Sequence, residues 1–330
     1  MKPLILTSLH GLQLKESGRA KTVIAFCFKF AWGQLPPPDK LDEYLGPHLP
    51  KQERGDHWSC FIVGRLPPEQ KDCQHLSLAE FCRPYKSVEL WFDSEPVDQL
   101  QLIWLLDGLR SDPETVAKLK LRLVSYDMLT ATPEQLAKWR VPVFKITPAY
   151  LELASTVWQA YRASMPEAFF GLLRRDLSRF PMLQPAMIDL VEELPSASTG
   201  LGATEMRLLE LVAAGYAHTN DLFYLRSLGL RGVFSDWELR LLIAGLAHGR
   251  TPALMGLDDE IRGICQENYY RFDDAFRRSR LSLTDFGRAV LAHEEDFSRH
   301  NPIDRWWGGT HLTNDNLWRY DPVLIPPVRQ

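Results

Sequence analysis

Short apolar runs separated by turn residues mark the first third of the chain. Residues 4–7 and 22–28 predict buried strands, the second because it is rich in β-branched and aromatic side chains. Residues 88–92 and 121–125 predict two more strands. Residues 97–109 between them are apolar on nearly every side, which places that helix in the core. Strand, helix and strand at this spacing predict a βαβ unit with a parallel sheet.

Beyond the last of these strands, the apolar positions recur at helical spacing. Residues 132–135 form a capping box with proline at the first helical position, and residues 164–167 predict another box. Residues 148–161 carry an apolar stripe on one face. We therefore expect a helical region over residues 131–195, followed by a linker at the Ser- and Thr-rich residues 195–200.

The C-terminal part combines helices with a short strand pair. Three helices are predicted over residues 204–214, 221–228 and 235–246. The alternating residues 280–283 predict a strand that leads into a last helix over residues 284–291. Three helices, a strand pair and a helix follow one another in the order of a winged helix-turn-helix domain.

The predicted fold class is an α/β N-terminal domain with a small parallel sheet, followed by a mainly α region with a winged-helix-like C-terminal domain. The length of 330 residues suits two domains, or one domain with a large appendage. The expected boundaries are 1–130 for the Rossmann-like α/β domain, 131–195 for the helical region, and 200–330 for the winged-helix-like domain with its ordered tail.

Composition and charge narrow the function classes. The chain is 45% hydrophobic and 24% charged, with a formal net charge of -4 and a pI of about 6.2. Nucleic-acid-binding chains usually carry a basic surplus, so we expect at most weak, salt-sensitive binding to duplex DNA. No apolar stretch approaches the roughly 18 residues of a membrane span, so no membrane partner is expected.

The five cysteines, at positions 27, 60, 73, 82 and 265, include no CxxC pair. They favour reduced thiols in a cytoplasmic protein over a zinc ribbon or a disulfide framework. The chain contains no Gly-rich phosphate loop, no nucleophile elbow and no HExxH motif. We accordingly predict no resident cofactor and no metal.

Three acids follow directly after the strand at 88–92. Asp93, Glu95 and Asp98 lie where the carboxyl end of a strand meets a helix, and ligands of open α/β sheets bind at that edge. Together with His10, which follows the first strand, they are candidate ligand-binding residues that could hold a divalent cation or act as general acid and base. In the alternative interpretation, the acids only favour the helix N-terminus through its dipole.

Basic residues are dense near the predicted C-terminal strand. Arg277, Arg278 and Arg280 lie there and Arg240 lies on the third helix of the winged-helix pattern, so these four are the nucleic-acid candidates. Two acids begin the same third helix, however, and they would meet phosphates unfavourably. We therefore expect this domain to contact an unknown protein partner, with DNA as a weak partner at most.

Aromatic residues concentrate in the tail. Residues 301–320 hold three of the 10 tryptophans, which predicts an ordered segment because a disordered one would leave these rings in water. A Gly-Gly pair in the middle predicts a tight turn. Arg305, Trp307 and His311 flank the turn and are further ligand-binding candidates, on the hypothesis that the turn shapes a pocket.

Two segments together resemble a known family. Residues 90–100 (LWFDSEPVDQL) and 301–312 (NPIDRWWGGTHL) are similar to an uncharacterised bacterial family that contains domain of unknown function 1835 and a companion C-terminal domain. The resemblance covers nearly the whole chain, including residues 23–37 and 200–205. The chain departs from the family pattern twice: the loop after the first strand lacks an aspartate, and Ser94 stands where relatives carry a histidine. The family has no established activity, so the resemblance implies a fold more than a function.

Two hypotheses of different kinds follow. The first is a cytoplasmic regulatory or interaction protein whose winged-helix-like domain contacts a protein partner. The alternative is an enzyme, or a nucleotide- or metal-binding protein, with an acidic site at the C-terminal edge of the N-terminal sheet. Fold class alone does not decide between them.

Overall fold

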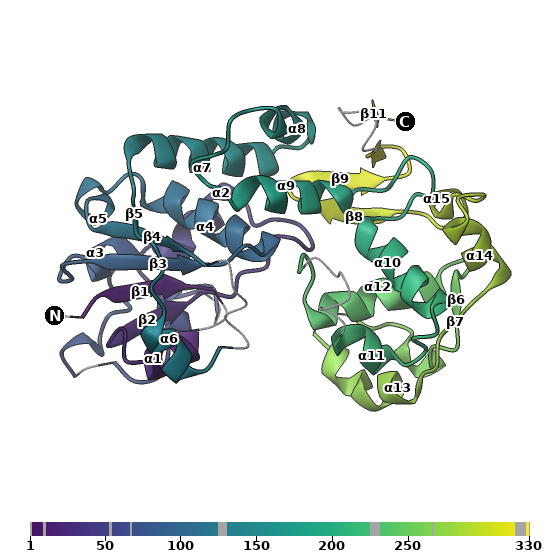
Figure 1. Cartoon of the computed structure of the whole chain (residues 1–330), viewed down its shortest axis with the longest axis horizontal. Coiled ribbons are helices and arrows are strands. Elements are labelled where there is room, and N and C mark those ends of the chain that lie inside the picture. Colours follow the sequence, from purple (N-terminus) through teal and green to yellow (C-terminus); the bar gives the residue numbers. More distant parts are fainter. Residues whose placement is uncertain are drawn as a thin grey trace. The chain divides into compact units, whose positions relative to one another are not determined.

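The N-terminal strands form one sheet with the order β2-β1-β3-β4-β5 in the computed structural model (Figure 1). β1 (Leu4–Thr7), β2 (Thr22–Ala25), β3 (Val88–Phe92) and β4 (Leu119–Leu123) run parallel, and β5 (Phe144–Lys145) pairs with β4 in the antiparallel direction. The order reverses at β1, because the chain returns from β2 to the opposite side of β1 when it forms β3. The predicted small parallel sheet is confirmed.

The structure describes residues 2–8, 11–52, 55–66, 68–124, 131–224, 232–265, 267–320 and 328–329. These residues belong to two units. The N-terminal unit comprises Met1–Phe30, Leu35–Tyr161 and Asp176–Ala186, and the C-terminal unit comprises Ala31–Gln34, Arg162–Arg175 and Met187–Gln330.

Helices cover both faces of the sheet. Every residue of β1 and β3 is buried, as expected of parallel strands between two helical layers. On one face α4 (Pro96–Leu109) packs against α7 (Pro148–Tyr161), and on the other α1 (Gly11–Glu16) contacts α6 (Pro133–Lys138) (Figure 1). α4 starts with a proline, which has no N–H to leave unpaired, and its apolar side chains are buried all round the helix.

Shorter helices fill the connections of the N-terminal unit. Aromatic rings pack beside them: the ring of Phe28 lies 4.6 Å from that of Tyr44 and 4.8 Å from that of Trp104. The remaining elements of this unit are α2 (Pro38–Leu45), α3 (Leu78–Cys82) and α5 (Pro113–Val116), with 3-10 turns at Trp58–Phe61 and Pro68–Gln70.

The helices expected over residues 131–195 do not form a region of their own. α6 and α7 belong to the N-terminal unit, where the ring of Trp158 lies 5.0 Å from that of Phe30. α8 (Glu167–Leu173) belongs to the C-terminal unit. α9 (Leu183–Glu192) begins in the first unit and ends in the second. The apolar stripes of these helices are therefore divided between two cores.

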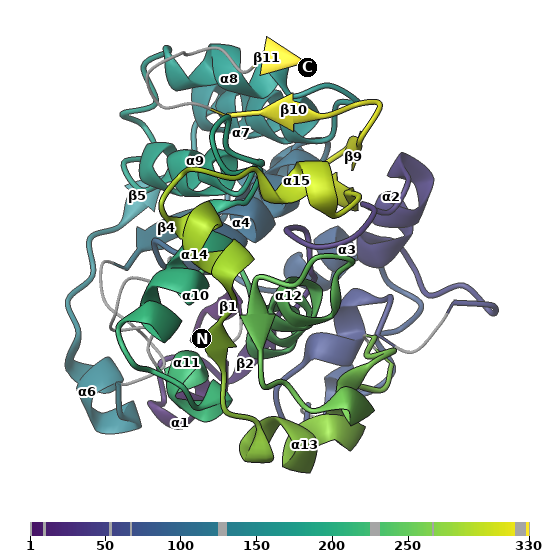
Figure 2. The same cartoon turned by 90° about the vertical axis from the view of Figure 1, so that its right-hand side faces the viewer.

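The C-terminal unit is mainly helical (Figure 2). α10 (Ala203–Ala213) packs on α12 (Asp236–His248) and on α14 (Asp285–Leu291), and one core cluster includes buried residues of all three helices. The other helices of this unit are α11 (Thr219–Tyr224), α13 (Asp273–Arg278) and α15 (Phe297–His300), with 3-10 turns at Asp259–Ile261 and Tyr269–Phe272.

A small antiparallel sheet accompanies these helices. β6 (Leu254–Met255) pairs with β7 (Ser282–Leu283), and His218 forms an isolated antiparallel bridge with Arg280 just before β7. The segment at 280–283 therefore lies between residue 218 on one side and β6 on the other. One face of this sheet contributes Leu254 to the core, whereas Met255 is exposed.

The tail folds back as a hairpin. β8 (Asp304–Trp307) pairs with β9 (Thr310–Thr313) around the Gly-Gly turn, and β10 (Trp318–Arg319) pairs with β11 (Val328–Arg329). Trp307 is buried, and its Nε1 donates a hydrogen bond to the carbonyl oxygen of Leu190 at 2.6 Å. Across the part of the chain that the structure describes, no helix combines the length and hydrophobicity of a membrane span.

Candidate functional site

The carboxyl ends of β1 and β3 meet where the strand order reverses. Ser8 Oγ donates to Asp98 Oδ2 at 2.5 Å, and the N–H of Asp93 donates to the same oxygen at 3.3 Å. Asp93 Oδ1 in turn accepts the N–H of Glu95 at 2.8 Å. Both aspartates are buried, and burial raises the pKa of Asp98 to about 6, although the hydrogen bonds from Ser8 and Asp93 act to lower it.

These contacts give the aspartates a structural role in the turn from β3 to α4. The Asp93 carboxylate accepts the N–H of Glu95 within the turn, and the Asp98 carboxylate links the turn to Ser8 by accepting its hydroxyl. Among the described residues, no group of three or more His, Cys, Asp or Glu side chains could hold a metal ion. A metal site at Asp93, Glu95 and Asp98 therefore finds no support, because the protein's own donors occupy the buried carboxylates. His10, the fourth candidate at this edge, lies outside the described residues.

Replacing Asp98 by asparagine is expected to remove part of the pH dependence of stability. The pKa of Asp98 is about 6 in the folded chain and ordinarily 3.8, so the folded chain retains a proton that the unfolded chain loses. Asp98 therefore lowers the free energy of unfolding as the pH rises from about 4 to about 6, by about 3 kcal/mol in total. The measurement is the free energy of unfolding in urea at several pH values. The stability of Asp98→Asn relative to that of the unsubstituted chain should increase by up to this amount between about pH 4 and pH 7.

Glu193 provides the internal reference for this experiment. Its pKa is raised by burial to about 7, so Glu193 also makes the free energy of unfolding fall as the pH rises. Asp98→Asn keeps this contribution, because Glu193 is unchanged. A difference between Asp98→Asn and the unsubstituted chain that stays constant with pH would show that Asp98 is ionised in the folded chain from low pH.

The arginines predicted for nucleic acid are mostly paired with acids. Arg240 is in contact with Asp273, and its guanidinium lies 5.0 Å from the centre of the Phe276 ring. Arg278 Nη2 lies 2.7 Å from Asp258 Oδ2 and 2.9 Å from Glu260 Oε2, while Arg277 lies 3.9 Å from Asp274 and Arg280 is exposed. Three of the four candidates therefore carry an acidic partner, which reduces the positive charge that they offer to phosphates.

The tail candidates do not share one site, because the pleat of the hairpin separates them. Arg305 and Trp307 lie two residues apart in β8 and point to one face, whereas His311 is paired with Trp306 and lies on the other face. Arg305 Nη1 binds Glu205 Oε2 at 2.9 Å, and Trp307 is buried. His311 stacks on the Trp306 ring at 4.5 Å. Arg305 lines a hollow of about 500 Å³ together with Glu205, and neither Trp307 nor His311 is among the described residues that line it. The hypothesis that the turn shapes a pocket stays a prediction.

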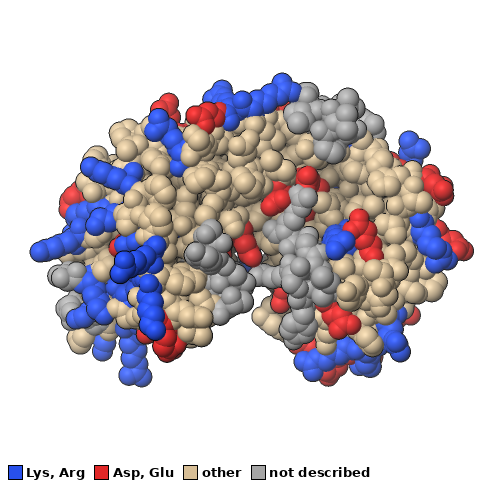
Figure 3. Space-filling model, viewed as in Figure 1, with Lys and Arg blue, Asp and Glu red and all other residues tan. Residues whose placement is uncertain are grey.

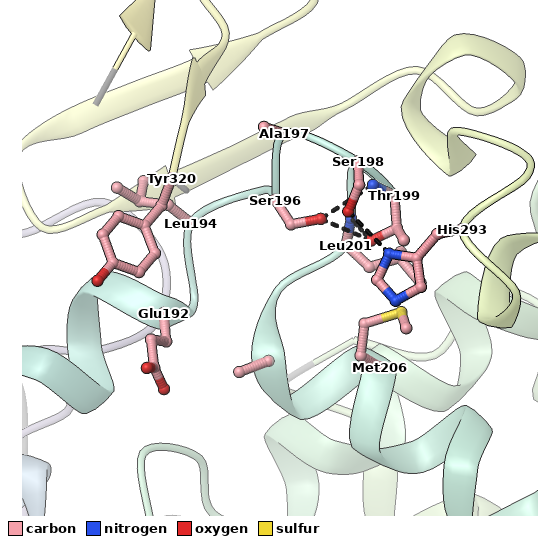
Figure 4. A pocket seen from close by; sticks show the side chains of 11 residues that line it. Glu192, Leu194, Ser196, Ala197, Ser198, Thr199, Leu201, Met206, His293 and Tyr320 are labelled. Atoms are coloured by element: carbon pink, nitrogen blue, oxygen red, sulfur yellow. Dashed lines mark hydrogen bonds between the residues drawn. The ribbon is translucent and has the colours of Figure 1, made fainter. Parts of the chain in front are cut away.

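A second hollow, of about 610 Å³, lies at residues 195–201, within the C-terminal unit (Figure 4). We call it the linker hollow. Figure 4 shows Tyr320 and Glu192 on one side of it, and the Ser-rich loop, His293 and Met206 on the other. The volume falls within the range of about 300–1,000 Å³ that is typical of small-molecule sites.

Hydroxyl groups fix the shape of the loop that forms this wall. Ser196 Oγ and Thr199 Oγ1 lie 2.7 Å apart, and the N–H of Thr199 donates to Ser196 Oγ at 3.0 Å. The N–H of Ala197 donates to the carbonyl oxygen of Tyr320, which joins the loop to the tail. The segment predicted as a linker is thus hydrogen-bonded structure. The Ser-x-x-Thr spacing was the signal in the sequence, because hydroxyl side chains often close turns of this length.

Ser198 is the hydroxyl that faces a histidine. Ser198 Oγ lies 2.9 Å from His293 Nδ1, and both residues are exposed (Figure 4). His293 follows α14 with a φ of 60°. It ends that helix through hydrogen bonds from its own N–H to Val290 and from the N–H of Glu294 to Ala289. Nothing in the local sequence predicts this pair, because its members are 95 residues apart.

Carboxylates occupy the helix N-terminus beside the hollow. Glu205 Oε2 accepts the N–H of Gly202 at 2.9 Å, and Glu193 Oε2 accepts that of Thr204 at 3.2 Å. An anionic ligand would meet two acids here, although helix N-termini commonly bind anions. Among the residues that the structure describes, no lysine or arginine lines the hollow. The linker hollow therefore suits a neutral or positively charged molecule better than a phosphate.

No protein-family model matches the chain, and no curated protein matches it.

Proposed function

We propose that this chain is a regulatory protein that binds a small molecule in the linker hollow and contacts a protein partner through a winged-helix-like module. The observation that carries the proposal is the composition of the wall. Ala203 and Met206 belong to α10, the first helix of the module, and His293 lies two residues beyond the end of α14, its last helix. A bound molecule would touch both ends of the module, so binding could change the free energy of the module's conformations.

The order of elements supports the winged-helix part of the proposal. Along the chain, α10 is followed by residue 218, then by α11 and α12, and then by β6 and β7. Residue 218 bridges to Arg280 just before β7, and β7 pairs with β6, so the three segments lie side by side as a small sheet. The segment between β6 and β7 would be the wing, and here it includes α13. The resemblance to the family with domain of unknown function 1835, carried by residues 90–100 and 301–312, is part of the same proposal.

The burial of α12 favours a protein partner over DNA. In a DNA reader, the corresponding helix presents polar side chains to the major groove. Here only Asp236 and Gly245 of α12 are exposed, and Arg240 is in contact with Asp273. On the visible face of this unit, basic and acidic side chains are interspersed (Figure 3). A continuous positive surface, which duplex binding needs, is not visible on that face.

The wall of the hollow also indicates the class of ligand. Hydroxyls of Ser196 and Ser198 and the ring of His293 offer hydrogen bonds, while Met206 offers apolar contact. Glu192 adds a carboxylate (Figure 4). We therefore expect a small neutral or amine-bearing molecule with an apolar part, and we expect its phosphorylated form to be rejected.

Filling the hollow is expected to abolish ligand binding. Ala203→Trp places a large ring at the first residue of α10, where the wall of the hollow begins. The measurement is thermal unfolding with compound pairs that differ by a phosphate, such as nucleosides and nucleotides. A neutral ligand at about 100 times its Kd should raise the free energy of unfolding by about 2.7 kcal/mol, and Ala203→Trp should remove this gain.

Ala213→Trp is the matched control, because Ala213 is exposed at the opposite end of the same helix and does not line the hollow. It should keep the full ligand response. Compounds that stabilise Ala203→Trp and the unsubstituted chain equally would contradict the proposal.

One observation keeps a nucleotide site in the N-terminal unit as a second candidate. Gln99 Oε1 is buried beside the β3–α4 turn and has no hydrogen-bond partner among the described residues. It lies near the reversal of strand order, where ligands of open α/β sheets bind. A ligand response that is lost in Asp98→Asn and kept in Ala203→Trp would favour this second site.

A further inference from the structure

The geometry points to Ser198 as a nucleophile, with His293 as its base, that accepts the acyl group of small uncharged esters entering the linker hollow. This inference rests on the proposed function, because the ester would occupy the same hollow. It adds a chemical reaction that binding alone does not require.

The first support is the contact between the two side chains. A nucleophile and its base must lie within hydrogen-bond reach, and Ser198 Oγ lies 2.9 Å from His293 Nδ1. In the tautomer that carries its proton on Nε2, Nδ1 accepts the hydroxyl proton of Ser198. Both side chains are exposed at the hollow, so a carbonyl compound can reach them (Figure 4).

The second support is the backbone of His293. Among the described residues it is the only one other than glycine with a positive φ, and its value is 60°. A helix end in this conformation usually carries glycine, because a Cβ disfavours it. A histidine at this place directs an imidazole toward Ser198, and strained backbone of this kind gathers at functional sites.

The third support is a free backbone donor in the loop. The N–H of Ala197 donates to Tyr320, that of Thr199 to Ser196 Oγ, and that of Gly200 to the carbonyl oxygen of Ser196. The N–H of Ser198 has no acceptor within the described part of the chain. It can therefore stabilise the negative oxygen that forms when the Ser198 hydroxyl attacks a carbonyl.

The reaction balances without a metal or a redox partner. Ser198 Oγ bonds to the ester carbon while its proton passes to His293 Nδ1. The carbon–oxygen bond to the alcohol breaks, and the alcohol leaves with that proton, which gives an acyl-serine. Water then attacks the acyl carbon while His293 takes its proton. Return of the proton to Ser198 Oγ releases the carboxylic acid and restores the hydroxyl.

The test uses the full chain and a fluorophosphonate, which reacts with activated serine hydroxyls. Intact-mass spectrometry measures the adduct and peptide mapping locates it, which separates it from products at the exposed Cys27, Cys60 and Cys265. We expect a single adduct on Ser198.

Three variants distinguish a nucleophile from an ordinary surface hydroxyl. Ser198→Ala should lose the adduct. Ser282→Ala is the control, because Ser282 is an exposed serine of β7 that does not line the hollow, and it should label like the unsubstituted chain. His293→Asn should label about 100-fold more slowly, since asparagine tolerates a positive φ but is no base.

The outcomes separate this inference from the proposed function. Absence of an adduct, or an adduct that forms as fast in His293→Asn, would overturn the nucleophile. In that case a ligand response that survives in Ser198→Ala leaves the proposed function standing. An adduct on Ser198 that depends on His293 supports the inference. If Ala203→Trp does not slow that labelling, the hollow is not where the ester binds, and the inference fails in its present form.

Discussion

Replacing Arg319 by alanine is expected to destabilise the C-terminal unit by about 3–5 kcal/mol. The Arg319 side chain is 5% exposed, and its Nη2 lies 2.7 Å from Asp296 Oδ2, which is 8% exposed. Nη1 also donates to the carbonyl oxygen of Ser196 at 2.9 Å. Without Arg319, the buried carboxylate loses its close cation. The melting temperature of this unit should fall by about 10 °C, measured by calorimetry.

Arg299→Ala is the matched control, because Arg299 approaches the same carboxylate from the surface. Its Nε lies 3.6 Å from Asp296 Oδ2 while its side chain is 78% exposed, so its removal should cost less than about 1 kcal/mol. Combining Arg319→Ala with Asp296→Ala should recover part of the loss, since no lone charge then stays buried. Equal effects of the two arginine substitutions would show that burial of the pair contributes little.

Gly309→Ala is expected to cost at least about 3 kcal/mol. A Cβ at Gly309 would lie 1.9 Å from the carbonyl oxygen of Arg162 and 2.8 Å from that of Ala163. Both atoms belong to backbone, so a rotamer change cannot relieve the overlap. Either the hairpin must move away from residues 162–163 or the turn must open. The free energy of unfolding, followed by tryptophan fluorescence, should drop accordingly.

Gly308→Ala tests whether close approach or turn conformation causes that loss. Gly308 has a φ of 53°, which an alanine adopts at a cost of about 1–2 kcal/mol. It should therefore be the milder substitution of the two. If Gly308→Ala is as damaging as Gly309→Ala, the turn conformation, and not the contact with Arg162, limits the hairpin.

Local chemistry made the N-terminal unit predictable. The strand at Val88–Phe92 and the helix at Pro96–Leu109 have side chains that are apolar in nearly every direction, and such segments can only be buried. Pro96 marks the helix start because proline loses nothing at the first helical position. The strand order could not be predicted from the local sequence, because it depends on contacts between residues far apart in the chain, such as Leu6 and Leu90.

The expected cap at Ser164 shows how two local signals compete. Serine followed three residues later by glutamate predicts a helix from Ser164, but α8 begins at Glu167 with Pro166 as its cap. A proline disfavours helical backbone in the residue before it, here Met165. The proline therefore moved the start of the helix.

The candidate site was missed because the same residue types form solvent-exposed linkers and loops that are held by hydrogen bonds. Ser196, Ser198 and Thr199 are equally suited to a solvated connection and to turns closed by their hydroxyls. What distinguishes the two cases is the tail and His293, both about 100 residues away in the chain. For Asp93 and Asp98, the local pattern correctly predicted their place at the end of the strand. It could not predict which groups donate hydrogen bonds to them.

The two outer strands of the N-terminal sheet have a consequence for association between copies of the chain. β5 is only two residues long, runs against its neighbour and carries an exposed lysine, so it offers a second chain a very short ladder. At the other edge of the sheet, Ile62 forms a β-bridge with Ile24, and the N–H of Val63 donates to the carbonyl oxygen of Val23. Backbone groups on the outer side of β2 are therefore already paired within the chain. Edge-to-edge pairing, a common first step of aggregation by β-sheets, is thereby restricted at both ends of the sheet.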